Sequence, residues 1–449
     1  MSIIIPANSA VSGDFTAANS LMFNYGDSAY LNRTLGTPTN NIKWTWSTWV
    51  KRTRITGSQQ RIFYAENGAG SNYTTIQFDD EQKIQWFNEI GGTDMQLLTS
   101  RQFRDIGAWM HLVFVYDSAN ATAADRQIIY VNGVRETAFA QENTAGSNVT
   151  TAINQAVSHE IGAGSGSYYD GSMTHVNFID GTAYPATAFG EVDSTSGIWT
   201  AKTTPSVTYG NNGFFLKMEN ASAMGTDSSG NSNTFTVSGS LTKNQDTPAN
   251  NFATLNPLVQ GTSTNARTFS NGNNTIVLGR DSASVSTLGV TSGKYYCEIK
   301  CVTDAANPVI GIAGLSSPAL TNPWGGTNLV GVDEYGYVND GTKKGNAGSF
   351  TSYGDTWTTG DIISIAYNAT TGTLWFGKNG TWQNSATATE IANGTTTNSA
   401  FTGLSGTYFM GCCDAATPTG DTFSTNFGNG HFGTTAVTTN SGNGYAGTD

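Results

Sequence analysis

Short stretches in which apolar and polar residues alternate recur along most of the chain. The clearest lies at residues 360–382 (GDIISIAYNATTGTLWFGKNGTW), where Ile363, Ile365 and Tyr367 alternate with Ser and Ala. This period of two predicts a β-strand with a buried face. A second strand follows, with Trp375 on one face and its Leu and Phe neighbours on the other, and an Asn-Gly dipeptide after it favours a tight turn. The stretch therefore predicts a β-hairpin in the middle of a sheet.

Similar strands are expected throughout the chain, and no segment keeps the 3.6-residue period of an amphipathic helix. In the first half they are residues 20–34 (two short strands around a Gly-Asp turn), 42–51, 61–65, 73–78, 83–87, 95–100, 109–117 and 127–134. Later ones are 213–219, 293–300, 309–313, 336–340, 408–413 and 422–427. This spacing predicts an all-β fold of two tandem antiparallel β-sandwich (jelly-roll) domains joined by a short connector.

A chain of 449 residues is too long for one ordinary core, so more than one domain is expected. The predicted parts are an N-terminal arm (1–20), a first sandwich (21–200), a connector (201–251), a second sandwich (252–432) and a polar C-terminal tail (433–449).

Few residues of the chain are charged. Charged residues make up 12%, against about 25% in a typical soluble protein, and 53 glycines accompany abundant Thr, Ser and Asn. The net charge of −12 comes with no basic run, which argues against nucleic acid and anionic membranes as partners. No window reaches the ~18 apolar residues of a membrane span. The start, MSIIIPANSA, lacks the basic and apolar regions of a signal peptide, so secretion by that route is not expected.

The four cysteines are expected to be reduced core residues. Cys297 and Cys301 lie on one strand face roughly 13 Å apart, too far for a disulfide. Cys412 and Cys413 are adjacent and should point to opposite faces. No C-x-x-C or histidine pair at a ligand spacing accompanies them, so zinc is not expected.

Two sets of motifs resemble known families. WMHLVFVYD (109–117), IYVNGV (129–134), HEIG (159–162) and YDGSMTHVNFI (169–179) resemble laminin-G-like domains of the concanavalin A-like superfamily, over about residues 15–200. GKYYCEIK (293–300), VIGIA (309–313), GDIISIAY (360–367), GTLWFGKNG (372–380) and a final NFG resemble a SPRY domain over about residues 252–432. Cys297 stands where most SPRY domains have tryptophan. The closing segment of the first domain and the lead-in to the second resemble those of phage structural proteins.

The resemblance implies binding, and the SPRY family has no catalytic residues to transfer. We therefore expect a non-enzymatic virion structural protein of a tailed phage: a fibre, an appendage, or a head or tail decoration. It would assemble in the host cytoplasm, lie on the outer virion surface as a homo-oligomer, and bind capsid or tail proteins or a host surface glycan. One alternative is an architectural cement or adaptor protein without a ligand. A glycan-degrading enzyme is another, although no E-x-D-x-E-like carboxylate array occurs.

Aromatic residues expected at loops are the candidate contacts for a ligand or partner, because an exposed ring can stack on a sugar or anchor a protein. They are Tyr168, Tyr169, Trp324, Tyr335, Tyr337 and Trp382. No cofactor is expected apart from a possible structural calcium ion, which laminin-G-like domains often hold. Its candidate oxygen ligands are Asp79, Asp117 and Asp170.

Overall fold

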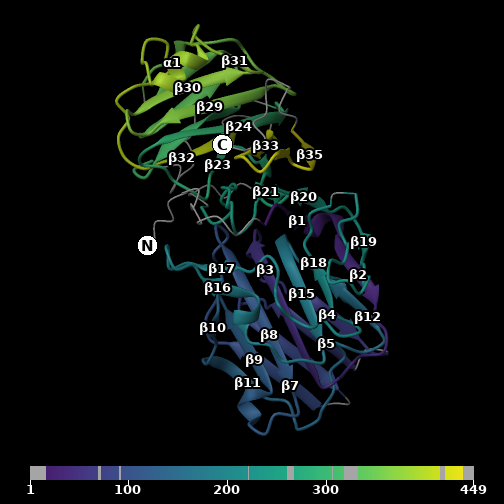
Figure 1. The fold of residues 1–449 in the computed structure, drawn as a ribbon. Helices are drawn as coiled ribbons and strands as arrows, with labels where there is room; N and C mark the ends of the chain where they lie inside the picture. The colour runs from purple at the N-terminus through teal and green to yellow at the C-terminus, as the bar shows by residue number, and fades with distance from the viewer. Residues whose placement is uncertain are drawn as a thin grey trace. The chain divides into compact units, whose positions relative to one another are not determined.

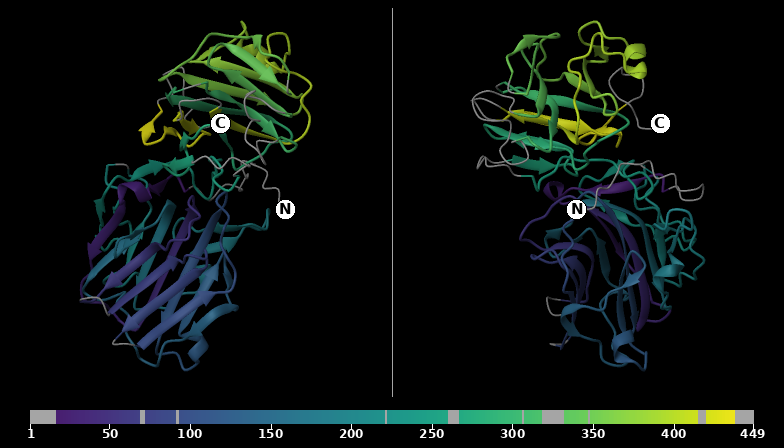
Figure 2. Two further views of the ribbon diagram at one scale, coloured as in Figure 1. Left: turned by 180° about the vertical axis from the view of Figure 1, so that it is seen from behind. Right: turned by 90° about the vertical axis from the view of Figure 1, so that its left-hand side faces the viewer.

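A computed structural model of the chain describes residues 17–68, 72–90, 93–220, 222–259, 267–305, 307–317, 332–346, 348–414 and 420–437. The chain divides between Asn251 and Phe252 into two compact units. Each unit consists of antiparallel sheets that face one another (Figures 1 and 2). The predicted fold class, all-β with two tandem antiparallel sandwiches, is confirmed. The units are called the first and second sandwich below.

The first sandwich is built from two eight-stranded sheets. One has the order β10 (Val134–Arg135), β9 (Gln127–Val131), β8 (Trp109–Asp117), β3 (Lys43–Arg52), β15 (Gly171–Asp180), β1 (Ser20–Phe23), β20 (Thr242–Asn244), with β18 (Phe214–Leu216) also paired to β15. The other has the order β11 (Phe139–Asn143), β7 (Thr93–Thr99), β6 (Ile84–Ile90), β5 (Asn72–Phe78), β4 (Gln60–Glu66), β12 (Ser158–Ile161), β2 (Tyr30–Thr34), β19 (Thr236–Ser238). Smaller elements are η1 (Tyr25–Asp27), η2 (Ala123–Asp125), η3 (Ala186–Ala188) and the pairs β13 (Ala163–Gly164) with β14 (Ser167–Tyr168) and β16 (Gly190–Val192) with β17 (Trp199–Ala201).

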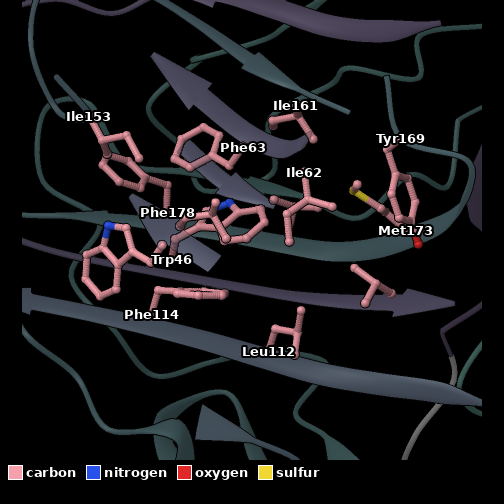
Figure 3. Packing of buried hydrophobic residues seen from close by; sticks show 14 of the residues in the cluster. Trp46, Ile62, Phe63, Leu112, Phe114, Ile153, Ile161, Tyr169, Met173 and Phe178 are labelled. Atoms are coloured by element: carbon pink, nitrogen blue, oxygen red, sulfur yellow. The ribbon is translucent and has the colours of Figure 1, made fainter. Parts of the chain in front are cut away.

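The main core of the first sandwich lies between these sheets. Trp46 from β3 stacks on Phe63 from β4 with ring centroids 5.0 Å apart. Phe114 and Phe178 pack beside the pair, and all four rings are buried (Figure 3). The alternation in β3 places its even-numbered tryptophans inward, as the sequence predicts.

A second apolar layer covers the outer face of the sheet that contains β3. Trp49 stacks on His111 at 5.0 Å, and the ring of Trp199 from β17 lies 6.0 Å from the same imidazole, with the two planes 24° apart. Further along, Phe189 near η3 packs in a cluster with Val113 of β8. Because both faces of this sheet are buried, β8 reads as a continuous apolar run.

Residues 201–251 differ from the predicted connector. Strand β18 pairs with β15, β19 with β2, and β20 with β1, so the segment adds strands to both sheets of the first sandwich. These strands have only three residues each. Such short strands carry too few alternations to be separated from a polar linker by pattern.

The second sandwich has a seven-stranded and a six-stranded sheet. The first has the order β21 (Arg267–Ser270), β22 (Thr275–Leu278), β33 (Thr422–Asn426), β24 (Lys294–Thr303), β29 (Ile362–Asn368), β30 (Thr373–Lys378), β31 (Thr381–Trp382). The second has the order β23 (Ser282–Val285), β32 (Tyr408–Asp414), β25 (Val309–Gly314), β26 (Glu334–Val338), β27 (Thr342–Gly345), β28 (Thr351–Ser352). A small pair, β34 (His431–Phe432) and β35 (Thr435–Ala436), and a helix, α1 (Ala388–Asn393), complete it.

The predicted hairpin is present as β29 and β30, with Ile365 opposite Phe376 in the core. Its outer face is also buried, because Trp375 and Ala366 lie there with almost no exposed surface. The helix α1 was not predicted. Thr387 and Glu390 form a capping box at its start, a local signal that six helical residues are too few to reinforce with a period.

The four cysteines are free and buried, as predicted. Cys412 faces the main core of the second sandwich while Cys413 lies in a separate cluster on the other face of its sheet. Burial raises the pKa of all four thiols, that of Cys301 to about 12.

These thiols are therefore expected to be unreactive in the folded protein, since the thiolate is the nucleophile. Titration with a chromogenic disulfide reagent at about pH 8 should label none of the four within minutes. After addition of denaturant it should label all four. Rapid labelling of native protein would contradict the buried positions of these residues.

Candidate binding surfaces

Three tyrosines form a partly exposed cluster in the first sandwich. The ring of Tyr168, on β14, lies 6.2 Å from that of Tyr25 and 6.3 Å from that of Tyr30. Tyr25 belongs to η1 and is 41% exposed, while Tyr30 begins β2. Segments far apart in the sequence thus bring three rings to one surface. We call Tyr25, Tyr30 and Tyr168 the tyrosine cluster.

Charged groups lie beside the tyrosine cluster. The guanidinium of Arg54 lies 3.9 Å from the centroid of the Tyr25 ring, a cation–π contact that orients this ring. Asp170 follows the cluster in the chain and is buried, with its carboxylate accepting a hydrogen bond from Thr53 Oγ1 at 2.9 Å. Burial raises the pKa of Asp170, while the Thr53 hydrogen bond and the Arg54 charge lower it. Charged side chains thus adjoin the tyrosine cluster at Tyr25.

Two of the sequence candidates are core residues. Tyr169 is buried beside Met173 and donates its hydroxyl to the Lys51 carbonyl at 2.8 Å (Figure 3). Tyr337 is buried against Phe376, with ring centroids 5.6 Å apart. The prediction that these rings are exposed is wrong, because each hydroxyl finds a partner inside the sandwich, which lets a whole tyrosine be buried.

The remaining aromatic candidates have different positions. Tyr335 is half-buried and packs edge-on against Phe401 at 5.1 Å. Trp382 is partly exposed at the end of β31 and meets the Tyr296 ring edge-on at 6.2 Å. Trp324 lies outside the described residues. Of the candidates that the structure describes, only Tyr168 and Trp382 are partly exposed and lie against a second ring that is also exposed. The second ring is Tyr25 for Tyr168 and Tyr296 for Trp382.

The three calcium candidates serve separate local structures. Asp79 accepts the backbone N–H of Lys83 at 2.7 Å and that of Glu81 at 3.0 Å, which closes the turn before β6. Asp117, at the end of β8, forms an ion pair with Lys43 at 3.0 Å. Asp170 lies beside the tyrosine cluster. Among the described residues, no group of three or more His, Cys, Asp or Glu side chains is placed to hold a metal ion.

Glu191 and Asp193 lie two residues apart, but each has a local partner. Asp193 accepts two backbone N–H bonds, from Thr195 at 3.1 Å and Ser196 at 2.7 Å, in an exposed turn. Glu191 lies 3.8 Å from the Lys202 ammonium, also at the surface. Among the described contacts, neither side chain meets a second carboxylate, which an acid–base pair for glycan hydrolysis requires. The contacts of Glu191 and Asp193 are those of a surface turn.

Comparison with known families agrees with these two sandwiches. Residues 24–187 match the Laminin_G_3 family of the concanavalin A-like lectin/glucanases superfamily. Residues 294–428 match the SPRY domain family. The chain carries a concanavalin A-like domain followed by a SPRY domain. Laminin-G-like and SPRY domains are in general binding modules.

Individual relatives are distant. A Drosophila melanogaster protein, "Ran-binding proteins 9/10 homolog", is 33% identical over 106 residues, which cover 22% of this chain and 10% of that protein. The chain thus spans about a tenth of that relative's length. The SPRY domain of human HERC1 is 17% identical, covering 38% of this chain and 96% of that one with a TM-score of 0.29. A heptameric SAP-like pentraxin from Limulus polyphemus is 13% identical, covering 51% and 96% with a TM-score of 0.34.

Exposed apolar side chains gather near one end of the SPRY domain. Leu315 follows β25 and is 60% exposed, Val332 precedes β26 and is 54% exposed, and Phe350 follows β27 and is 43% exposed. In the antiparallel order of β25, β26 and β27 these three positions adjoin the same end of the sheet. A protein partner can bury such side chains.

The tyrosine cluster and the exposed apolar group of Leu315, Val332 and Phe350 include residues that the sequence pattern did not identify as candidates, such as Tyr25 and Leu315. The signal for Tyr25 was its place in the Asn-Tyr-Gly-Asp turn after the first strand. None of the helices that the structure describes is long and apolar enough to cross a membrane.

Proposed function

We propose that the protein is a non-catalytic binding protein of a tailed-phage particle, in which the concanavalin A-like domain binds a host surface glycan through the tyrosine cluster. The partly exposed rings of this cluster are the observation that carries the proposal. Sugar rings have apolar faces that stack on aromatic rings, and tyrosine adds a hydroxyl that can bond to the sugar hydroxyls. Arg54 contacts the Tyr25 ring, and Arg54 and Asp170 add charged groups beside the cluster.

The setting in a virion is supported by composition. Only 12% of the residues are charged, so the surface hydrogen-bonds to water and sugars mainly through Thr, Ser, Asn and backbone groups. Buried, reduced cysteines suit assembly in a reducing cytoplasm. We place the protein on the outer surface of the head or tail, as a homo-oligomer in contact with capsid or tail proteins.

The proposal predicts that Tyr25→Ala and Tyr168→Ala each weaken glycan binding by about tenfold, or ~1.4 kcal/mol. The purified full chain would be tested on an array of bacterial capsular and lipopolysaccharide glycans, with the affinity for each positive glycan measured by biolayer interferometry. Tyr130→Ala, which removes another partly exposed tyrosine of the same domain, is the matched control and should bind as the wild type does. Glycan binding unchanged by both cluster substitutions would refute this assignment.

A second candidate function is architectural, with the SPRY domain joining particle components. The exposed Leu315, Val332 and Phe350 favour it. Purified particles would distinguish the two functions. If Phe350→Ser removes the protein from particles while glycan binding on the array persists, the exposed apolar residues of the SPRY domain attach the protein to the virion. A glycan depolymerase is not proposed, because hydrolysis needs a paired acid and base and Glu191 and Asp193 have other partners. Incubation with polysaccharide should therefore release no reducing sugar.

A further inference from the structure

A second aromatic group lies on the outer face of the seven-stranded sheet of the SPRY domain. Tyr296 on β24 is 41% exposed, and Trp382 on β31 is partly exposed. Their rings meet edge-on with centroids 6.2 Å apart. This face is remote in sequence from the exposed apolar residues near Leu315, and it belongs to the other sheet of the sandwich.

Strand register places polar side chains beneath these rings. Glu298 pairs with Ser364 on one side and with Asn426 on the other, so the three side chains form a row across β33, β24 and β29. Tyr296 begins the adjacent row, which continues through Ala366 to Trp375 on β30. All of these side chains except Tyr296 are buried.

Glu298 fixes the position of the Tyr296 ring. The Tyr296 hydroxyl donates to Glu298 Oε1 at 2.7 Å and lies 3.0 Å from Ser364 Oγ. A tyrosine whose hydroxyl is held at the sheet presents the face of its ring in one orientation. Asn426, the neighbour of Glu298 on β33, also forms a hydrogen bond with the Glu298 carboxyl. The Tyr296 ring is therefore fixed from below by a buried polar group of the sheet.

We propose that Tyr296 and Trp382 form a second carbohydrate site, which takes an uncharged sugar ring, and that Glu298 is its positioning residue. Stacking of the apolar face of a sugar on these rings supplies affinity, and Glu298 and Ser364 hold the Tyr296 ring in a fixed orientation for it. A phosphorylated or nucleic-acid ligand does not suit a site whose buried ionisable group is a carboxyl in a protein of net charge −12. The site does not depend on the tyrosine cluster.

The site carries a pH dependence of defined sign. Burial raises the pKa of Glu298 to about 7, while hydrogen bonds from Tyr296 and Asn426 act to lower it. Ionised Glu298 accepts a stronger hydrogen bond from Tyr296 than the protonated form does, so the ring is held better above that pH. Other titratable groups on the elements around Glu298 are Lys294 and Lys300, on the same face of β24, and His431 on β34 beside β33. None of these three groups is among the causes of the raised Glu298 pKa.

The experiment uses the full chain carrying Tyr25→Ala and Tyr168→Ala, so that the first site is disabled. This background is screened on the bacterial glycan array at about pH 8 and about pH 6. We expect it to retain a set of neutral glycans, with at least threefold stronger binding at the higher pH. Adding Trp382→Ala or Tyr296→Ala should lower that binding at least tenfold, and adding Glu298→Gln should remove the pH dependence. Adding Phe350→Ala, at the other exposed surface, should change nothing.

The outcomes are distinguishable from failure of the first site. If the background binds no glycan, or if Trp382→Ala leaves its binding unchanged, the second site is refuted whatever the tyrosine cluster does. If the background and the wild type give the same array pattern, the tyrosine cluster is refuted as a glycan site. The effect of Trp382→Ala then decides whether the second site exists. Circular dichroism melting of each variant checks folding, and Tyr296→Phe, which keeps the ring but loses the Glu298 bond, separates stacking from positioning.

Discussion

Lowering the pH from about 7 to about 4.5 is expected to unfold the concanavalin A-like domain while the SPRY domain remains folded. The cause is three buried histidines in the first domain, His111, His159 and His175. Burial lowers their pKa values to about 3, about 4 and about 4 respectively. All three are thus neutral in the folded protein across the physiological range.

The sign follows from proton binding. In the unfolded chain a histidine takes up its proton near pH 6.5, whereas the folded protein does so only near 3 to 4. Between these values the unfolded state binds more protons, so the free energy of unfolding falls as the pH falls. At about pH 4.5 each histidine costs roughly 2–3 kcal/mol, and three together approach the ~5–15 kcal/mol stability of a typical domain.

Buried carboxyls act in the opposite direction. Burial raises the pKa values of Asp79, Glu160 and Asp170, so protonation in acid stabilises the folded first domain and offsets part of the loss. In the SPRY domain the pKa of Glu298 is raised to about 7, so protonation of Glu298 stabilises that domain in acid, while the lowered pKa values of Asp361 and Glu390 act in the opposite direction. The two domains should therefore differ in the pH at which they unfold, and the first domain should unfold at the higher pH.

His111 shows why the proton is excluded. The Trp199 indole N–H, which can only donate, points to His111 Nδ1 at 3.0 Å, so the imidazole carries its hydrogen on Nε2 and donates to Ser47 Oγ at 2.8 Å. A second proton would break the Trp199 bond inside an apolar stack. Urea unfolding followed by fluorescence at about pH 7 and about pH 4.5 tests the prediction. His111→Gln should lower stability at pH 7 yet flatten the pH slope, and equal slopes would contradict it.

Much of the fold follows from local patterns. The strands β8 and β29 are recognisable because seven or more residues alternate or run apolar between turn signals. Strands of three residues such as β19 are not, because their partners, here β2, lie about two hundred residues earlier. Exposure at a loop end was equally hard to predict. Tyr168 and Tyr169 are adjacent, yet one lies in the tyrosine cluster and the other in the core.

Polar contacts between residues far apart in the chain could not be predicted from the sequence pattern either. The carboxylate of Asp180 accepts hydrogen bonds from the backbone N–H groups of Thr39 at 2.7 Å, Asn40 at 3.2 Å and Asn212 at 3.0 Å, and from Asn154 Nδ2 at 2.8 Å. Each donor comes from a different part of the chain or from a loop without period. A sequence shows that an aspartate ends a strand, but not that three segments converge on it. The same holds for the candidate site beneath Tyr296, whose partners are fixed by strand register.

Asp246→Ala is expected to lower the free energy of unfolding of the concanavalin A-like domain by about 3–5 kcal/mol. One carboxylate oxygen of Asp246 pairs with the Lys51 ammonium at 2.6 Å, and the other accepts from Trp109 Nε1 at 2.8 Å. Both ionised side chains are buried. The Asp246 carbonyl also accepts from Ser20 Oγ at 2.6 Å, so residue 246 joins the end of the domain's chain to its first strand.

The loss arises because removing Asp246 leaves a buried ammonium without its counter-ion, and the remaining Asn251 Oδ1, 2.7 Å from Lys51 Nζ, carries no charge. Urea unfolding at pH 7 measures the change, with Glu81→Ala as the matched control. That control breaks the ion pair of Lys83 with an exposed glutamate and should cost no more than about 1 kcal/mol. Replacing both partners, with Lys51→Met and Asp246→Leu, should recover stability relative to Asp246→Ala, because no buried charge is then unpaired. Equal losses for Asp246→Ala and Glu81→Ala would show that Asp246 does not hold residues 242–251 to the first sandwich.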